Sequence, residues 1–221
     1  MQREFWQERW GDGKIAFHQS DVHPMLRAHV PDLIQPGDRI LVPLCGKSLD
    51  LLHLLKFVTE PGGVVIGVEF VEQTVHDFFR ENNLRFETPS PGHFVAGRLE
   101  IFCRDFLTPL DQNSEIGPID FVYDRAALVA LPEEMRRAYA NNISALCRPG
   151  ARMLLVTFEY DQSRIDGPPF SIKPDHVREL YADAFEIREL ERSAIAPLNP
   201  RFAESGVQVV HEVAYELRRK S

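Results

Sequence analysis

The chain has 221 residues, of which 44% are hydrophobic and 26% are charged, and its formal net charge is −8. This length is sufficient for one α/β domain with a complete hydrophobic core. Because a phosphate backbone attracts clustered Lys and Arg, the acidic balance argues against nucleic acid as a partner. No apolar run approaches the ~20 residues that span a bilayer, and Met1–Trp10 lacks the basic start and apolar centre of a signal peptide. We therefore expect a cytoplasmic protein without a membrane partner.

The cysteines and histidines form no pattern typical of a metal site. The three cysteines, Cys45, Cys103 and Cys147, are scattered without C-x-x-C spacing, which also argues against a disulfide framework. The eight histidines show no ligand spacing. We expect no metal, and we expect Cys45 to be a small buried residue.

Residues 1–35 are predicted to form a helical cover that precedes the first strand. Trp6 and Trp10 recur at near-helical spacing within Arg3–Trp10, and a second helical stretch runs from about His23 to Leu33. The sheet itself does not need these aromatic residues. They therefore either belong to the core or cover a ligand.

A short apolar strand is predicted at Arg39–Val42, followed by a turn at Pro43–Gly46 and a helix over about Ser48–Val58. In an open α/β sheet, a nucleotide-like ligand binds at the carboxyl end of such a strand, and Gly46 allows the backbone to approach it closely. A single glycine is a weaker signal than G-x-G-x-x-G. The motif alone therefore leaves two interpretations open, a binding turn and an ordinary strand–helix connection.

The second strand, Val64–Val68, is continuous and rich in β-branched residues, as expected for a strand that is buried on both faces. Glu69 follows it, about 25 residues after the turn and near the ~20-residue offset at which an acidic residue reaches ribose hydroxyls in dinucleotide-binding folds. Alternatively, Glu69 is a negative charge at the start of the helix predicted over Val71–Asn82. The spacing favours the ribose role.

The remainder of the chain continues the alternation of strands and helices. Strands at Leu99–Cys103 and Ile119–Tyr123 lead to Asp105 and to Asp124-Arg125 at their carboxyl ends. The other elements are predicted as a loop over Phe86–Gly97, a helix from Pro132 to about Cys147, a strand at Arg152–Phe158, a helix at Asp175–Ala182, a strand at Phe185–Glu191, a loop over Ala194–Gly206 and a last strand at Val207–Leu217. This order predicts a single α/β domain over 1–221, with a doubly wound, mostly parallel, seven-stranded Rossmann-like sheet and an antiparallel C-terminal strand.

Several motifs along the chain are recognisable together, namely Trp6–Trp10 with Ala16–Gln19, Pro43–Lys47, Gly67–Glu69, Tyr123–Ala130 and Gly167–Phe170. In this order they resemble the class I S-adenosylmethionine-dependent methyltransferases and, more narrowly, the bacterial thiopurine S-methyltransferases. The resemblance covers essentially the whole chain, and Pro-Leu-Cys-Gly-Lys is unusual among methyltransferases at large.

The resemblance implies roles for individual residues. The implied cofactor contacts are Trp10, Leu44, Glu69 and Arg125, with Asp105 and Phe106 beside the adenine. The implied substrate contacts are Phe17, Arg125 and Arg201, although the residues that flank Arg201 differ from the family pattern.

Arg125 is the candidate catalytic residue, as a fixed cation near the cofactor carboxylate or near the substrate anion, where it would favour the thiolate. The alternative for Arg125 is an ion pair with Asp124 or with another acidic residue at the end of a strand. We expect the backbone of Leu44, rather than the side chain of Lys47, to contact the cofactor. His18 either forms structural hydrogen bonds or contacts substrate or water.

The implied activity is S-methylation of aromatic and heterocyclic thiols, such as thiopurines, with S-adenosylmethionine (SAM) as methyl donor and S-adenosylhomocysteine (SAH) as product. Selenium and tellurium compounds are further implied acceptors, and the resemblance implies a monomer. Methyl transfer from a sulfonium needs neither a metal nor a covalent intermediate, so catalysis can rest on positioning and on exclusion of water.

Three alternatives share parts of this pattern. An NAD(P)-dependent oxidoreductase would share the strand, turn and acidic residue but should carry the glycine fingerprint. A methyltransferase of halide, bisulfide or small inorganic thiols would have the same cofactor half. A cofactor-binding protein without activity would not need Phe17 or Asp124-Arg125.

Overall fold

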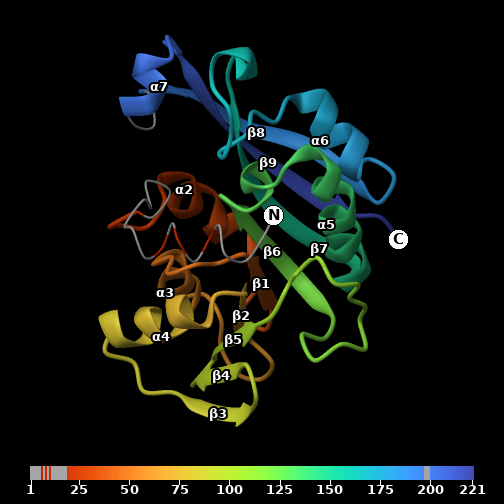
Figure 1. The fold of residues 1–221 in the computed structure, drawn as a ribbon. Coiled ribbons are helices and arrows are strands. Elements are labelled where there is room, and N and C mark those ends of the chain that lie inside the picture. The colour runs from red at the N-terminus through yellow and green to blue at the C-terminus, as the bar shows by residue number, and fades with distance from the viewer. Residues whose placement is uncertain (1–5, 7, 9, 11–18, 197–199) are drawn as a thin grey trace.

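In the computed structural model of the protein, which describes residues 6, 8, 10, 19–196 and 200–221, nine strands form one sheet in the order β3-β4-β5-β2-β1-β6-β7-β9-β8 (Figure 1). The strands are β1 Arg39–Pro43, β2 Val64–Glu69, β3 Glu87–Ser90, β4 His93–Ala96, β5 Leu99–Cys103, β6 Ile119–Arg125, β7 Cys147–Glu159, β8 Phe185–Ile195 and β9 Val210–Arg219. The five central strands from β5 to β7 pair in parallel, and the strands outside them pair antiparallel.

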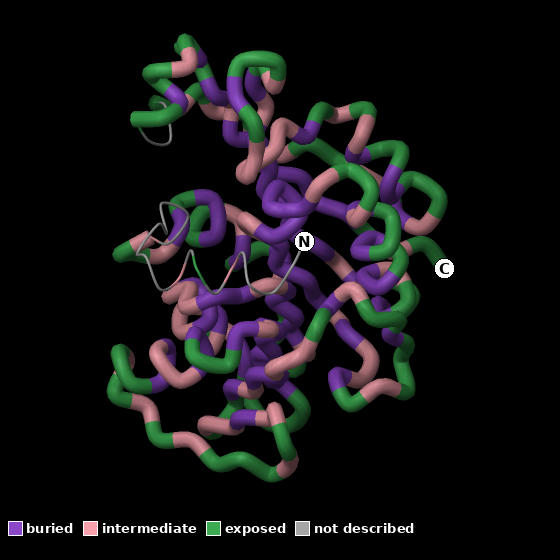
Figure 2. Tube along the Cα trace, viewed as in Figure 1, coloured by how far each residue is buried: buried purple, intermediate pink, exposed green. Residues whose placement is uncertain are grey.

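The helices are α2 Pro24–Leu33, α3 Asp50–Leu54, α4 Glu72–Glu81, α5 Glu133–Leu146, α6 Pro174–Tyr181 and α7 Pro200–Glu204, with 3₁₀ turns η1 Leu128–Ala130 and η2 Gln162–Arg164. Helices α2, α3 and α4 cover one face of the sheet, and α5 and α6 cover the other (Figure 1). Successive residues of β1 show the reason. Ile40 and Val42 pack into the core below α2–α4, whereas Leu41 packs into the core below α5 and α6, because side chains alternate along a strand. Buried residues accordingly follow the central strands (Figure 2).

The predicted doubly wound sheet is confirmed, including β9, which lies antiparallel between β7 and β8. Within the described residues, the sheet has nine strands rather than the predicted seven. The prediction of a loop over Phe86–Gly97 was wrong, because β3 and β4 form a hairpin there that extends the sheet edge. Two prolines, Pro89 and Pro91, made the segment look irregular, yet an edge strand tolerates a residue that lacks an N–H. Phe94 is the one β4 residue that is fully buried, so the alternation is weak.

Two other elements differ from the predictions. Helix α3 is only Asp50–Leu54, shorter than the predicted Ser48–Val58. The predicted loop over Ala194–Gly206 contains α7, which begins at Pro200 and buries Phe202. A proline is well tolerated at the start of a helix. Among the described residues, no helix is long and apolar enough to cross a bilayer.

The predicted N-terminal cover is described only in part. Helix α2 confirms the second predicted helical stretch. Most of the first predicted helix, Arg3–Trp10, lies outside the described residues, as do Phe17 and His18. Trp10 itself is described and is partly buried.

Candidate active site

The turn between β1 and α3 has an unusual backbone. Leu44 and Gly46 both have positive φ angles, 49° and 53°. A left-handed conformation costs a residue with a Cβ atom about 1 kcal/mol, so Leu44 is strained while Gly46 is not. The Cys45 N–H donates to the carbonyl of Val68 at 3.0 Å, which fastens the turn to the end of β2.

Glu69, the last residue of β2, joins the turn to the next helix. Its side chain is buried, and Oε2 accepts the Gly46 N–H at 3.1 Å, while Oε1 accepts the N–H groups of Phe70 and Val71 at 2.9 and 2.8 Å. Burial raises the pKa of Glu69 to about 7, although these hydrogen bonds act in the opposite direction. A carboxylate has roughly four acceptor positions, so one remains on Oε2. A ribose hydroxyl fits this position.

Trp10 packs against the same turn at Gly46. A Cβ atom on Gly46 would stand only 2.8 Å from Cζ2 of the Trp10 ring, so the close contact requires glycine. The Lys47 ammonium lies 5.6 Å from the centroid of this ring and 2.7 Å from the Glu81 carboxylate. Lys47 is therefore engaged by Trp10 and Glu81.

Gly67 of β2 makes room for Cys45. A Cβ atom at Gly67 would lie 2.8 Å from the Cys45 sulfur. Cys45 is buried, as predicted, and desolvation, followed by the nearby charge of Glu69, raises the pKa of its thiol well above the ordinary value. Cys45 is thus a packing residue and a poor nucleophile.

Asp105 and Phe106 follow β5, whose end lies beside the end of β2. Asp105 is exposed, and its Oδ1 accepts the Leu107 N–H at 2.9 Å. The Phe106 ring is buried against Tyr139, with the ring centroids 5.3 Å apart. The sequence did not indicate Asn142 of α5, whose side-chain amide donates to the carbonyls of Phe106 and Thr108 and accepts the N–H of Leu110. This one side chain holds the whole 105–110 segment.

Asp124 and Arg125 end β6, which pairs with β1. The Asp124 carboxylate is fully buried, accepts the Tyr139 hydroxyl at 2.8 Å and the Leu128 N–H at 3.2 Å, and forms no ion pair with any described residue. Burial raises the pKa of Asp124 to about 6. Arg125 is partly buried at the end of the strand.

The Gly167–Phe170 motif lies in a loop that is fastened to the same region. The Phe170 N–H donates to the carbonyl of Val129 in η1 at 2.6 Å, and the Tyr160 hydroxyl donates to the carbonyl of Pro169 at 2.5 Å. A Cβ atom on Gly167 would lie 2.4 Å from the Phe170 ring. Arg201 of α7 is exposed and donates to the carbonyl of Asp166, so it contacts this loop.

A cavity of about 760 Å³ lies behind the loop, between the starts of α5 and α6. Arg136, which the sequence did not indicate, lines it with its guanidinium bonded to the Leu131 carbonyl and to His176, 5.3 Å above the Phe170 ring. None of the predicted site residues lines this cavity.

Instead, the predicted residues converge where four adjacent parallel strands end. Leu44 follows β1, Glu69 ends β2, Asp105 follows β5 and Arg125 ends β6. The chain order reverses between β1 and β6, which is the switch point at which open α/β sheets bind ligands. The close glycine turn and the acceptor position on Glu69 fit a nucleoside at this edge.

Solved structures of similar fold carry such a nucleoside product. The 1,6-didemethyltoxoflavin-N1-methyltransferase of Burkholderia thailandensis, with bound SAH, matches with a TM-score of 0.62 and 18% identity, over 99% of this chain and 87% of its own. The N-methyltransferase NodS of Bradyrhizobium japonicum, in complex with SAH, matches with a TM-score of 0.59 and 12% identity, over 89% of this chain and 84% of its own. The fold is that of the SAM-dependent methyltransferases.

The sequence comparison is more specific. The family model for thiopurine S-methyltransferase matches residues 1–220. Proteins named thiopurine S-methyltransferase from Azotobacter vinelandii and Bordetella petrii are 42% and 40% identical to this chain, each over 100% of both sequences. The chain belongs to the thiopurine S-methyltransferase family, and it is a SAM-dependent methyltransferase. The predicted resemblance and cofactor are thereby confirmed.

Proposed function

We propose that this protein transfers the methyl group of SAM to the sulfur of an aromatic or heterocyclic thiol, with thiopurines such as 6-mercaptopurine as model acceptors. The family supports thiol methylation. The observation that carries the site assignment is the buried Glu69 carboxylate, which joins the β1–α3 turn and retains an acceptor position at the carboxyl edge of the sheet. We further propose that residues 1–221 act as one domain.

The cofactor half of the site is assigned from these contacts. Glu69 accepts hydrogen bonds from the ribose, and the backbone of Leu44 contacts the amino-acid end of the cofactor. Trp10 covers the cofactor beside the turn that it contacts at Gly46. Because the Phe106 ring is buried against Tyr139, its contact with the adenine comes from the backbone, next to Asp105.

The reaction needs little proton chemistry from the protein. When bound, SAM supplies an electrophilic methyl group on a sulfonium centre. The acceptor sulfur attacks as a thiolate, the new sulfur–carbon bond forms as the sulfonium bond breaks, and the electron pair stays on the cofactor sulfur. Aromatic thiols ionise readily, so Arg125 can act as a fixed positive charge that favours the thiolate. From the resemblance, we assign Phe17 and Arg201 to binding of the acceptor; Arg201 donates to the Asp166 carbonyl in the loop that carries Gly167–Phe170.

The test is a methyl-transfer assay with Arg125→Ala. We expect transfer to 6-mercaptopurine to fall at least tenfold, since the charge-assisted contacts of an arginine are worth about 1.5–3 kcal/mol. Arg164→Ala is the matched control, because Arg164 is exposed and its ion pair within the described residues is with Asp161, three residues away. Unchanged activity in Arg125→Ala would remove this residue from the mechanism.

An acceptor panel decides among the related activities. Thiophenols, thiopurines, bisulfide, iodide, selenite and tellurite are offered to the wild-type protein, and binding of NADH is measured beside binding of SAH. We expect the aromatic thiols to give the highest kcat/KM and NADH not to bind. Preference for bisulfide or iodide would assign the chain to small inorganic acceptors, and tight SAH binding without any transfer would indicate a protein that only binds the cofactor.

We also propose that the protein is a cytoplasmic monomer that binds no nucleic acid. The acidic composition supports the absence of nucleic-acid binding, and the family resemblance supports the monomer. Light scattering after size exclusion, together with a DNA-binding titration at low salt, tests it. A mass near 50 kDa, about twice that of the chain, or binding of DNA would contradict it.

A further inference from the structure

A buried carboxylate connects the start of α2 with the middle of the sheet. Asp50, the first residue of α3, is 2% exposed. Its Oδ1 accepts the backbone N–H of His23 at 2.9 Å, and its Oδ2 accepts the hydroxyl of Tyr123 at 3.0 Å. His23 directly precedes α2, and Tyr123 lies on β6. One side chain therefore links three elements that are far apart in the sequence.

The His23 side chain makes a second connection. Its Nε2 lies 3.0 Å from Oε1 of Glu212 on β9, and the two side chains are 1% and 11% exposed. With a carboxylate as partner, Nε2 carries the proton. His23 is thus held to α3 through its backbone and to β9 through its ring.

This network is not built for stability alone. Burying polar side chains costs free energy that an apolar cluster of equal volume would not incur. Moreover, Nδ1 of His23 is buried and has no hydrogen-bond partner among the described residues, which is unfavourable for folding. Hydrogen bonds do, however, fix direction and register more sharply than apolar contacts do.

The network adjoins the candidate active site through β6 and through the β1–α3 turn. Tyr123 precedes Arg125 by two residues on β6, so the two side chains project from the same face of the strand. The two groups are also coupled electrostatically. Burial and the Asp50 charge raise the pKa of the Tyr123 hydroxyl, and the charge of Arg125 acts against this rise. Asp50 follows the turn that carries Leu44 and Gly46, and His23 follows the segment that carries Trp10.

We propose that His23, Asp50 and Tyr123 are positioning residues for the methyl-transfer site. They fix the position of His23, and with it the start of α2, relative to the β1–α3 turn and to Arg125. We infer that this in turn positions Trp10. The inference rests on the proposed roles of Trp10 and Arg125. Without the network, the protein still folds, but the Trp10 ring no longer packs in its native position against Gly46. The affinity for the cofactor therefore falls.

The test measures SAH binding by titration calorimetry in Tyr123→Phe and His23→Ala, below the unfolding temperature of each variant. We expect the Kd for SAH to rise at least threefold in both, and the KM for SAM to rise with it, while kcat changes less. His23→Gln, whose amide nitrogen can still donate to Glu212, should restore part of the affinity. Should one of the two variants fail to fold, Glu212→Gln, which removes the charge but keeps the shape, takes its place.

Two controls separate positioning from stability. Tyr181→Phe removes another buried tyrosine hydroxyl, one that has no hydrogen-bond partner among the described residues, and should leave the Kd unchanged. Asp38→Asn destabilises the opposite end of the sheet and should lower the unfolding temperature without changing the Kd. If Tyr123→Phe behaves like Asp38→Asn, the network is purely structural and the proposal is wrong.

A double-mutant cycle makes the test specific for Trp10. If the network acts through Trp10, the effect of Tyr123→Phe on the Kd for SAH should largely vanish in a Trp10→Ala background. Additive effects would show that the network does not act through Trp10 and would overturn the proposal. Failure of wild-type protein to bind SAH would instead refute the proposed cofactor site, so the two failures are distinguishable.

Discussion

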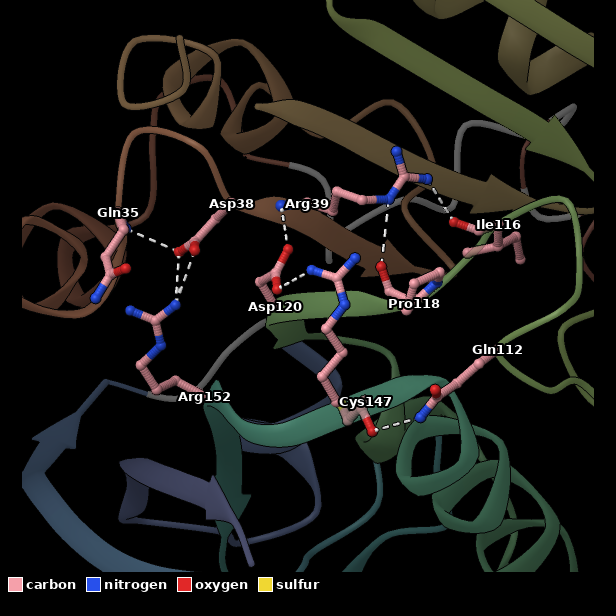
Figure 3. Close-up of polar contacts among 10 residues, drawn as sticks. Gln35, Asp38, Arg39, Gln112, Ile116, Pro118, Asp120, Cys147 and Arg152 are labelled. Atoms are coloured by element: carbon pink, nitrogen blue, oxygen red, sulfur yellow. Dashed lines mark hydrogen bonds and ion pairs between the residues drawn. The ribbon is translucent and has the colours of Figure 1, made fainter. Parts of the chain in front are cut away.

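The carboxylates at the two ends of the parallel sheet have different kinds of partner. At the amino end, each carboxylate is neutralised by a guanidinium (Figure 3). Asp38, just before β1, accepts two contacts from Arg152 Nη2 at 2.9 and 2.8 Å, and the N–H of Gln35 at 2.8 Å. Asp120, at the start of β6, accepts the backbone N–H of Arg39 at 3.0 Å and a contact from Arg148 at 2.5 Å.

At the carboxyl end, the carboxylates have no such partners. Glu69 and Asp124 accept only backbone N–H groups and a tyrosine hydroxyl, and neither forms an ion pair with a described residue. Burial therefore raises the pKa of Glu69 to about 7 and that of Asp124 to about 6.

This difference between the carboxylates suggests that those at the amino end contribute to stability and that those at the carboxyl end contribute to ligand binding. A carboxylate bound by two guanidinium contacts has little capacity for a ligand, whereas Glu69, held by three backbone N–H groups, retains an open acceptor position. Perturbed pKa values tend to gather at functional sites for this reason. The comparison predicts that substitutions at the amino end change the stability of the protein, and that substitutions at the carboxyl end change what it binds.

The largest expected effect is that of Asp38→Ala. The Asp38 and Arg152 side chains are 7% and 14% exposed, and removing one partner of a buried pair leaves the other charge unpaired. We expect the free energy of unfolding to fall by about 3 kcal/mol, measured by urea denaturation, with an unchanged Kd for SAH. Arg148→Ala is the control, because Arg148 is 45% exposed and should cost less than ~1 kcal/mol. Weakened SAH binding in Asp38→Ala would contradict the prediction that substitutions at the amino end change stability alone.

The next effect is expected at Glu69. Glu69→Gln removes the charge and replaces one acceptor oxygen with a donor, which opposes the Gly46 N–H. Since a hydrogen bond to a charged group contributes about 1.5–3 kcal/mol, the affinity for SAH should fall about 10- to 100-fold. Calorimetry measures this change, and Glu72→Gln is the matched control because Glu72 is exposed on α4. An unchanged Kd in Glu69→Gln would exclude the ribose role.

Sequence reasoning was most successful where a local pattern has one structural solution. Val64–Val68 is apolar at every position, which specifies a strand buried on both faces, and Glu69 was located because it ends that strand. The ends of parallel strands meet at one edge, so the convergence of Leu44, Glu69, Asp105 and Arg125 followed from the alternation of strands and helices. The β3–β4 hairpin was missed because an edge hairpin with prolines buries too little to leave a pattern.

Contacts between distant segments could not be predicted. Asn142 is a polar residue in the middle of a helix, and nothing near it in the sequence indicates that it binds the 105–110 segment. Likewise, neither His23 nor Asp50 indicates the other, because hydrogen-bond partners are chosen by packing. Even at Glu69, the sequence indicated a free acceptor at the end of a strand but not its bond to Gly46.

The smallest expected effect is the pH dependence that Asp124 contributes to stability. Its pKa is about 6 in the folded protein and 3.8 in the ordinary reference state, so the folded state binds more protons between these values. Stability therefore falls as the pH rises through this window. From pH 5 to pH 8 the loss should be about 1–2 kcal/mol. Urea denaturation at several pH values measures it.

Asp124→Asn isolates this contribution. The amide oxygen can still accept the Leu128 N–H, and the Tyr139 hydroxyl can accept from the amide nitrogen, so the contacts of Asp124 are largely retained. The variant should lose about 1–2 kcal/mol less than the wild type between pH 5 and pH 8. If both lose the same amount, the Asp124 carboxyl does not carry a raised pKa. The carboxyl end of the sheet would then differ from the amino end only at Glu69, the residue assigned to the cofactor.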